Sequence, residues 1–181
     1  MILNILRISI IALVTIFQYS FVNFVFPDFA TPNVVFMFIV AYIIILGIKG
    51  SWTWIIIFGI FSDLFTFSFL GKNILIFILG AYLVNLVLHF LVIERQGGLK
   101  IFAFFVLAIG ITTLYTLMEI VWPENRIVLI NLIQLKNNFL FFLKSIIFQC
   151  AINTVVLYLS YGIVKKFEKE ATFYRKKNIE Y

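Results

Sequence analysis

One acidic residue interrupts a long apolar run in the first half of the chain. Residues 49–73 read KGSWTWIIIFGIFSDLFTFSFLGKN, and Asp63 stands among isoleucines and phenylalanines. An ionised carboxylate near the centre of a membrane-spanning helix costs about 2.5–3.5 kcal/mol on insertion scales, so it normally faces other helices or water. On a helix, one small and polar face holds Gly59, Ser62, Asp63 and Thr66, spaced i, i+3, i+4 and i+7. We expect this face to pack against neighbouring helices that shelter the acid.

Two more charged residues lie inside apolar runs at a similar depth. Asp63 and Glu119 each stand about four residues before the end of a run, and Lys144 about five residues after the start of another. At about 1.5 Å per residue, all three lie roughly 6–8 Å below the same membrane surface. We hypothesise that Asp63, Glu119 and Lys144 form one ionic cluster that ties three helices together. The alternative is that each group snorkels to the interface on its own, above all the long side chain of Lys144.

The remaining reactive side chains do not form a catalytic or metal-binding pattern. His89 has no Cys, Asp or second His at metal-ligand spacing. The sequence contains no HExxH, GxSxG, P-loop or GxGxxG motif. Intramembrane proteolysis needs paired catalytic groups deep in the lipid, which one Asp and one Glu near the surface do not supply. The sequence therefore predicts a protein that is not an enzyme and that uses no cofactor or metal.

Composition places these residues in a polytopic membrane protein. Of the 181 residues, 64% are hydrophobic and 12% are charged, whereas soluble domains have about 45–50% apolar and about 25% charged residues. The net charge of +6 does not indicate a nucleic-acid partner. The basic residues cluster at the ends of apolar runs and near the C-terminus, as the positive-inside rule requires. With one cysteine, Cys150, no intramolecular disulfide is possible.

We predict an all-α bundle of six transmembrane helices. Their approximate ranges are 5–25, 32–48, 51–67, 73–93, 99–122 and 139–164. The second opens on Thr31-Pro32, a cap residue followed by a proline at the first helical position. The second and third are short, so a single re-entrant hairpin is the alternative. The first begins like a signal peptide, but no small-residue cleavage site follows it, and we expect an uncleaved span.

Basic residues predict the topology. With the N-terminus in the cytoplasm, ten of the 14 Lys and Arg residues face inward, so we expect both termini inside. We divide the chain into one transmembrane bundle, residues 1–164, and a basic cytoplasmic tail, residues 165–181. The tail is either a solvated flank that stops transfer or a helix lying on anionic headgroups.

Stripes of small and polar residues run along four of the predicted spans. Besides the Asp63 face, they are Ala81, Asn85 and His89; Thr112, Thr116 and Glu119; and Ser145, Gln149 and Asn153. Interhelical hydrogen bonds in membranes contribute about 0.6 kcal/mol each, and we expect these stripes to hold the bundle together. The second span has almost no polar residue between Asn33 and Gly47 except Tyr42. We expect that span to face lipid or another protein.

These features resemble the MreD family of bacterial rod shape-determining membrane proteins. The resemblance is carried by the span that opens on Pro32, the turn Lys49-Gly50, the pattern Gly59-x-x-x-Asp63, and Leu70-Gly71-x-Asn73 before the next span. The chain length, the number of spans and the basic C-terminal end also agree with the family. The fifth and sixth spans match it in character but not in motif.

The resemblance implies a non-enzymatic member of the cell-elongation machinery in the bacterial inner membrane. Such a protein would sit beside its most direct partner, the single-span protein MreC. It would couple MreC and cytoplasmic MreB filaments to peptidoglycan synthesis by RodA and its transpeptidase. The family likeness further implies a fold similar to the six-span substrate-binding subunits of energy-coupling-factor vitamin transporters. The residues expected to contact partners are those that carry the resemblance, Pro32, Gly59, Asp63, Gly71 and Asn73.

Two other functions fit the same sequence. A vitamin-binding transport subunit could use Asp63, Glu119, Lys144 and Trp122 as part of an outer pocket. Those subunits usually present an Ala-x-x-x-Ala pattern on the first span, where this chain has only Ala12. A scaffold protein or small channel is the third possibility. A copurifying small molecule would favour the transporter, and capture of a single-span periplasmic coiled-coil protein would favour the elongation machinery.

Overall fold

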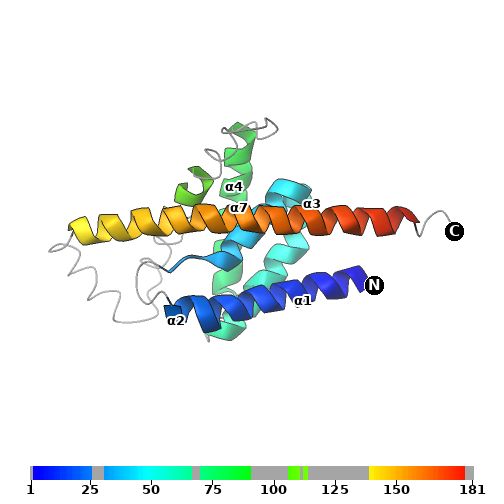
Figure 1. Ribbon diagram of the computed structural model, residues 1–181, viewed down its shortest axis with the longest axis horizontal. Helices are drawn as coiled ribbons and strands as arrows, with labels where there is room; N and C mark the ends of the chain where they lie inside the picture. The colour runs from blue at the N-terminus through cyan, green and yellow to red at the C-terminus, as the bar shows by residue number, and fades with distance from the viewer. Residues whose placement is uncertain are drawn as a thin grey trace.

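The computed structural model describes residues 2–25, 31–66, 70–90, 106–110, 112–113 and 139–177 (Figure 1). These residues are helical except for the segment Thr31–Asn33 and the turn at Leu70 and Gly71. The elements are α1 (Ile2–Ile16), the π-helical turn η1 (Phe17–Val22), α2 (Asn23–Val25), α3 (Val34–Thr66), α4 (Lys72–Phe90) and α7 (Phe139–Lys177). The predicted all-α fold is confirmed for the described part of the chain.

Four helical stretches among the described residues are long and apolar enough to cross a membrane. They are Ile5–Val25, Val34–Thr66, Lys72–His89 and Ile146–Glu170. They correspond to the predicted first span, the second and third together, the fourth and the sixth. The predicted fifth span lies largely outside the described residues. Within it, only residues 106–110 and 112–113 are described, and they are helical. A membrane protein is thus supported, and the count of six spans stays a prediction.

A break at Gly47 divides α3 into two halves. Gly47 has φ 70° and ψ 167°, a conformation that residues with a Cβ rarely adopt. The break falls at the boundary that the sequence predicts between the second and third spans. Residues 34–46 extend only about 20 Å at 1.5 Å per residue, less than the hydrocarbon core of about 30 Å. The first half of α3 is therefore a short interior helix.

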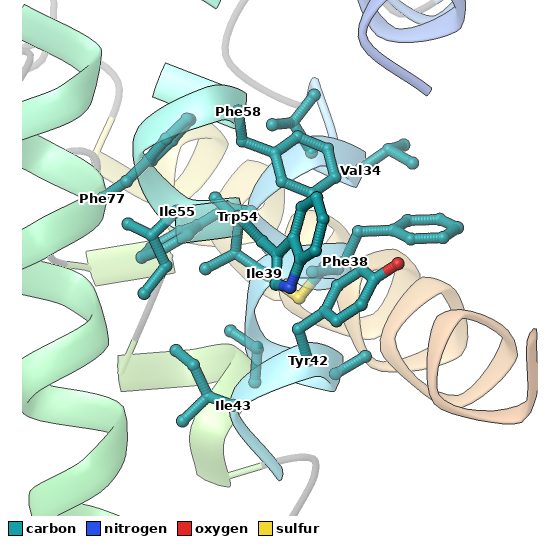
Figure 2. Packing of buried hydrophobic residues seen from close by; sticks show 14 of the residues in the cluster. Val34, Phe38, Ile39, Tyr42, Ile43, Trp54, Ile55, Phe58 and Phe77 are labelled. Carbon is teal, nitrogen blue, oxygen red and sulfur yellow. The ribbon is translucent and has the colours of Figure 1, made fainter. Parts of the chain in front are cut away.

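This first half of α3 is the centre of the fold. Every residue from Val34 to Ile43 is buried, and α3 packs against α4, α7 and α1. In Figure 2 its side chains meet those of the second half of α3 and of α4. The rings of Phe36 and Phe77 stack with centroids 5.3 Å apart, and those of Tyr42 and Trp54 lie 6.4 Å apart.

The expectation that this span faces lipid or a partner is therefore wrong. Lipid tails and a helix-bundle interior are equally apolar. An unbroken apolar sequence consequently suits either environment, and the lack of a polar stripe does not distinguish them. What places residues 34–43 inside is their short length and the polar side chains that bind the backbone just before them, described below.

The longest helix, α7, continues past the predicted boundary between bundle and tail. It runs without a break from Phe139 to Lys177, 39 residues, and crosses the whole view in Figure 1. Val164 is 2% exposed and Glu168 6% exposed, so the packed bundle extends beyond residue 164. At 1.5 Å per residue the helix is about 58 Å long, far more than the hydrocarbon core needs.

Candidate functional site

Asp63 caps the N-terminus of α4. One carboxylate oxygen accepts a hydrogen bond from the Gly71 N–H at 2.7 Å, and the other from the Asn73 N–H at 2.8 Å. The first amides of a helix have no acceptor within the helix, and a negative charge is favoured there by the helix dipole. Asp63 is 2% exposed. The expectation that neighbouring elements shelter this acid is confirmed.

The residues around Asp63 hold the turn between α3 and α4. The Asn73 side-chain amide donates to the Thr66 hydroxyl at 3.2 Å, and that hydroxyl donates to the Ser62 carbonyl at 2.9 Å. Gly71 has φ 104°, in the region that favours glycine. One carboxylate, one hydroxyl and one amide thus fix where α4 starts relative to the end of α3.

Gly59 lets the two helices approach closely. A Cβ added at Gly59 would lie 2.6 Å from Ile74 Cγ1, 2.7 Å from Ile74 Cα and 3.0 Å from Ile74 N. Two of those three atoms are backbone, so α4 itself occupies the space that a side chain would need. The predicted packing of the Gly59 to Thr66 face against a neighbouring helix is therefore confirmed, and that helix is α4.

The structure brings together four of the five residues that are expected from the sequence to contact partners. Gly59, Asp63, Gly71 and Asn73 meet at the turn between α3 and α4, whereas Pro32 lies at the start of α3. Pro32, Gly59, Asp63 and Asn73 are buried within this chain, and Gly71 is half-buried. Their described contacts are internal.

The predicted ionic cluster is described only in part. Asp63 is buried against the first turn of α4, and Lys144 is exposed on α7. Glu119 lies outside the described residues. The joining of Asp63, Glu119 and Lys144 therefore stays a prediction.

A second polar junction, which the sequence does not reveal, surrounds the segment Thr31–Asn33. The Gln18 side chain accepts a hydrogen bond from the Val34 N–H at 2.7 Å and donates to the Pro32 carbonyl at 3.0 Å. It also donates to the Asn23 side-chain oxygen at 3.0 Å. Gln18 belongs to η1 and is 6% exposed. The only sequence signal is a glutamine inside an apolar run, which does not name its partners.

Helix α7 completes this junction with two residues of a predicted stripe. Asn153 accepts from the Asn33 N–H at 3.0 Å and donates to the Thr112 hydroxyl at 2.9 Å. Gln149 donates to the Thr31 carbonyl at 2.7 Å. The predicted role of these polar residues in joining helices is confirmed for Asn153 and Thr112, while Gln149 joins α7 to the segment before α3. Their spacing of four residues puts both amides of α7 on the face that meets α3.

An ion pair joins α1 to α7 at the opposite end of the bundle. The Arg7 guanidinium donates to the two carboxylate oxygens of Glu168, from Nε at 3.0 Å and from Nη2 at 2.5 Å. The side chains are 15% and 8% exposed. The guanidinium carbon also lies 5.0 Å from the ring centroid of Trp54, within cation–π range. Glu168 falls in the predicted tail, so the sequence gives no reason to pair it with residue 7.

A cavity of about 210 Å³ lies between α4 and residues 106–110. Its walls are apolar side chains, among them Leu83, Val84 and Leu107, together with the backbone of Gly80 and Gly110. Neither Asp63 nor Lys144 lines it. This cavity therefore differs from the polar outer pocket expected of a vitamin-binding subunit.

The remaining candidate groups do not converge on a reactive centre in the described part of the chain. His89 is exposed at the end of α4, and Cys150 is buried in α7. Among the described residues, no three His, Cys, Asp or Glu side chains are close enough to hold a metal ion. The buried polar side chains described above bind backbone groups and one another. Comparison of the whole chain with models of protein families, with characterised proteins and with solved structures finds no match.

Proposed function

We propose that this protein is a non-enzymatic component of the bacterial cell-elongation machinery, similar to MreD. The observation that best supports this role is the use of Asp63. One oxygen of this buried acid binds the backbone amide of Gly71, just before α4, and the other binds that of Asn73 in α4, which favours an architectural role for the residue over a chemical one. Four of the residues that carry the family resemblance, Gly59, Asp63, Gly71 and Asn73, build this turn.

In this role the chain lies in the inner membrane, and both termini are in the cytoplasm. Its six-span fold is similar to that of the vitamin-binding transport subunits. The chain sits beside MreC and couples MreC and MreB filaments to peptidoglycan synthesis by RodA and its transpeptidase. Because the first half of α3 is interior, we place partner contact on the exposed apolar faces of α1, η1 and α7. These faces include Leu13, Phe21, Val155 and Leu159, each at least 54% exposed.

Depletion in a rod-shaped bacterium tests the function. We expect depleted cells to become round and a plasmid copy of the wild-type chain to restore the rod. Asp63→Ala should restore it poorly, with a reduced amount of protein in the membrane, whereas Glu170→Ala at an exposed position should restore it fully. Normal shape together with a vitamin requirement would instead establish the transport subunit, as would a vitamin that copurifies with the chain.

Site-specific photocrosslinking tests the placement of the partner. A photoreactive residue at Phe21 or Leu159 should capture a single-span periplasmic coiled-coil protein in living cells. The matched control is Phe36, which has no exposed surface and should capture nothing. Equal capture from all three positions, or from none, would contradict the placement of the partner on η1 and α7.

A further inference from the structure

The exposed surface of α7 at the end of the bundle, residues 165–170, has an unequal distribution of charge. Lys165, Lys166 and Lys169 are exposed, and so is Glu170. Glu168, which interrupts the lysines in the sequence, is turned inward and is 6% exposed. The exposed side chains of residues 165–170 thus carry three positive charges and one negative charge, a net of plus two.

Glu168 is turned away from this surface because its carboxylate pairs with Arg7. Both carboxylate oxygens of Glu168 accept hydrogen bonds from the Arg7 guanidinium, which neutralises the acid within the bundle. Without this pairing, the same six residues would present two negative charges beside three positive ones. The ion pair therefore determines how cationic this part of α7 is.

This cationic surface coincides with the end of a membrane-spanning stretch. The apolar stretch of α7, Ile146–Glu170, has 25 residues and is about 37 Å long at 1.5 Å per residue. A bilayer measures about 30 Å across its hydrocarbon and about 40–45 Å with headgroups, so the lysines lie at headgroup depth. The Lys165 ammonium is 5.7 Å from the ring centroid of Tyr161, and tyrosine is enriched at this depth.

We propose that residues 161–170 of α7 bind anionic phospholipid headgroups in preference to zwitterionic ones, and that the Arg7–Glu168 pair keeps this surface cationic. Lysine side chains at this depth attract anionic headgroups at close range. Phosphatidylglycerol keeps the full negative charge of its phosphate because its glycerol headgroup is neutral, whereas the choline of phosphatidylcholine balances that charge, so exposed ammonium groups favour the former. Lipid is the occupant favoured by the depth of the lysines, since an acidic protein would need a surface that stands clear of the membrane.

Native mass spectrometry of the purified full-length chain tests this binding. The chain is titrated in detergent with phosphatidylglycerol and, in parallel, with phosphatidylcholine. We expect the wild type to bind phosphatidylglycerol more tightly, and Lys165→Gln and Lys166→Gln each to weaken that binding about fivefold. Lys144→Gln is the matched control, because Lys144 is also exposed on α7 but about 30 Å away along the helix. It should leave the binding unchanged.

Two further variants test the part played by the ion pair. Arg7→Gln releases the carboxylate of Glu168 and should weaken binding of phosphatidylglycerol about as much as the loss of one lysine. Arg7→Gln combined with Glu168→Gln removes both charges and should restore it. Equal affinity of the wild type for the two lipids, or an equal loss in Lys144→Gln and Lys165→Gln, would overturn the proposal. Failure of the double variant to recover would overturn the role of the pair, since the double variant is expected to be at least as stable as the single variant.

Discussion

At the scale of single residues, the acid that most suggests chemistry in this sequence turns out to be a helix cap. A carboxylate in an apolar run is costly to ionise, and here two backbone amides and the dipole of α4 stabilise its negative charge. The cap also joins two elements, since Asp63 belongs to α3 and the two amides belong to the start of α4 and the turn residue just before it. Removing it should therefore loosen the packing of the two helices.

Asp63→Ala should lower the free energy of unfolding by about 2–4 kcal/mol, because it leaves two buried N–H groups without an acceptor. Asp63→Asn should cost less, since the amide keeps one oxygen and can accept one of the two bonds. Unfolding in mixed micelles, followed by circular dichroism, measures both changes. Glu170→Ala is the control at an exposed acid, where a change within about 0.5 kcal/mol is expected. Equal losses at the two positions would show that Asp63 does not act as a cap.

Two glycines should differ in whether their alanine variants can be rescued. At Gly59 the added methyl group meets Cγ1 of Ile74 and also two backbone atoms of Ile74, and no side-chain change can remove the two backbone atoms. At Gly80 it meets the ring of Phe36, which is a side chain. We therefore expect Phe36→Leu to recover part of the stability lost in Gly80→Ala, and Ile74→Ala to recover none of that lost in Gly59→Ala.

The melting temperature in detergent measures both pairs. Gly162→Ala is the control, because nothing lies within 4 Å of its added Cβ. In a helix this change should raise stability by up to about 1 kcal/mol. Rescue at Gly59 would mean that α3 and α4 are farther apart there than described, whereas a loss at Gly162 would mean that another part of the molecule lies closer to it than described.

At the scale of elements, the sequence locates helices better than it locates their neighbours. Apolar length predicts α1, α4 and the start of α7, and Gly47 to Gly50 predicts the break in α3, since local chemistry determines both. The prediction that the first half of α3 faces lipid or a partner is wrong, because an apolar helix suits lipid and protein interior alike. The sequence also does not identify the partners of Gln18, since a single amide in an apolar run can face any neighbouring helix.

The candidate site, like the helices, was predictable in its local pattern but not in its contacts. The spacing of Gly59, Ser62, Asp63 and Thr66 predicts a shared face, and the structure places that face against α4. The cap itself was not predicted, although an acid eight residues before Gly71 at a helix start was the available signal. Glu168 could not be assigned to Arg7, because the two are 161 residues apart and nothing local links them.

The segment Thr31–Asn33 offers a test of how elements cooperate. Gln18→Leu should destabilise the protein by about 1–3 kcal/mol, because it leaves the Val34 N–H and the Pro32 carbonyl unpaired in an apolar interior. Asn153→Leu should do the same through the Asn33 N–H. Because both side chains hold one short segment, we expect the loss in the double variant to be smaller than the sum by at least about 0.5 kcal/mol.

Unfolding in mixed micelles measures this coupling. Thr113→Val is the control, because the Thr113 hydroxyl is exposed and binds only carbonyls of its own helix among the described contacts. Its effect should be small and additive with that of Gln18→Leu. Additivity of Gln18→Leu and Asn153→Leu would mean that the segment is held at two independent points.

At the scale of the whole molecule, α3 lies at the centre and its two ends are fixed by different chemistry. Neutral amides of η1 and α7 bind the backbone at its start, and Asp63 near its end caps α4. Away from the Gln18 junction, α1 and α7 are joined by the Arg7–Glu168 pair, next to Trp54 of α3. This pair links α1 to α7 through residues that are 161 positions apart in the sequence. Its loss should therefore loosen the packing of α7.

Arg7→Leu leaves the Glu168 carboxylate charged and largely buried, which is more costly than the absence of both charges. Because the two side chains keep 15% and 8% of their surface exposed, we expect a loss of about 2–3 kcal/mol, below the 3–5 kcal/mol of fully buried pairs. Arg7→Leu with Glu168→Leu should recover at least half of it, while Arg7→Leu with Glu170→Leu should recover none. Hydrogen exchange should rise in α7 beyond Val164 in the single variant and return to the wild-type rate in the recovered one. If the two double variants are equally unstable, the stability of the bundle does not depend on this ion pair, and the end of α7 is held by apolar packing alone.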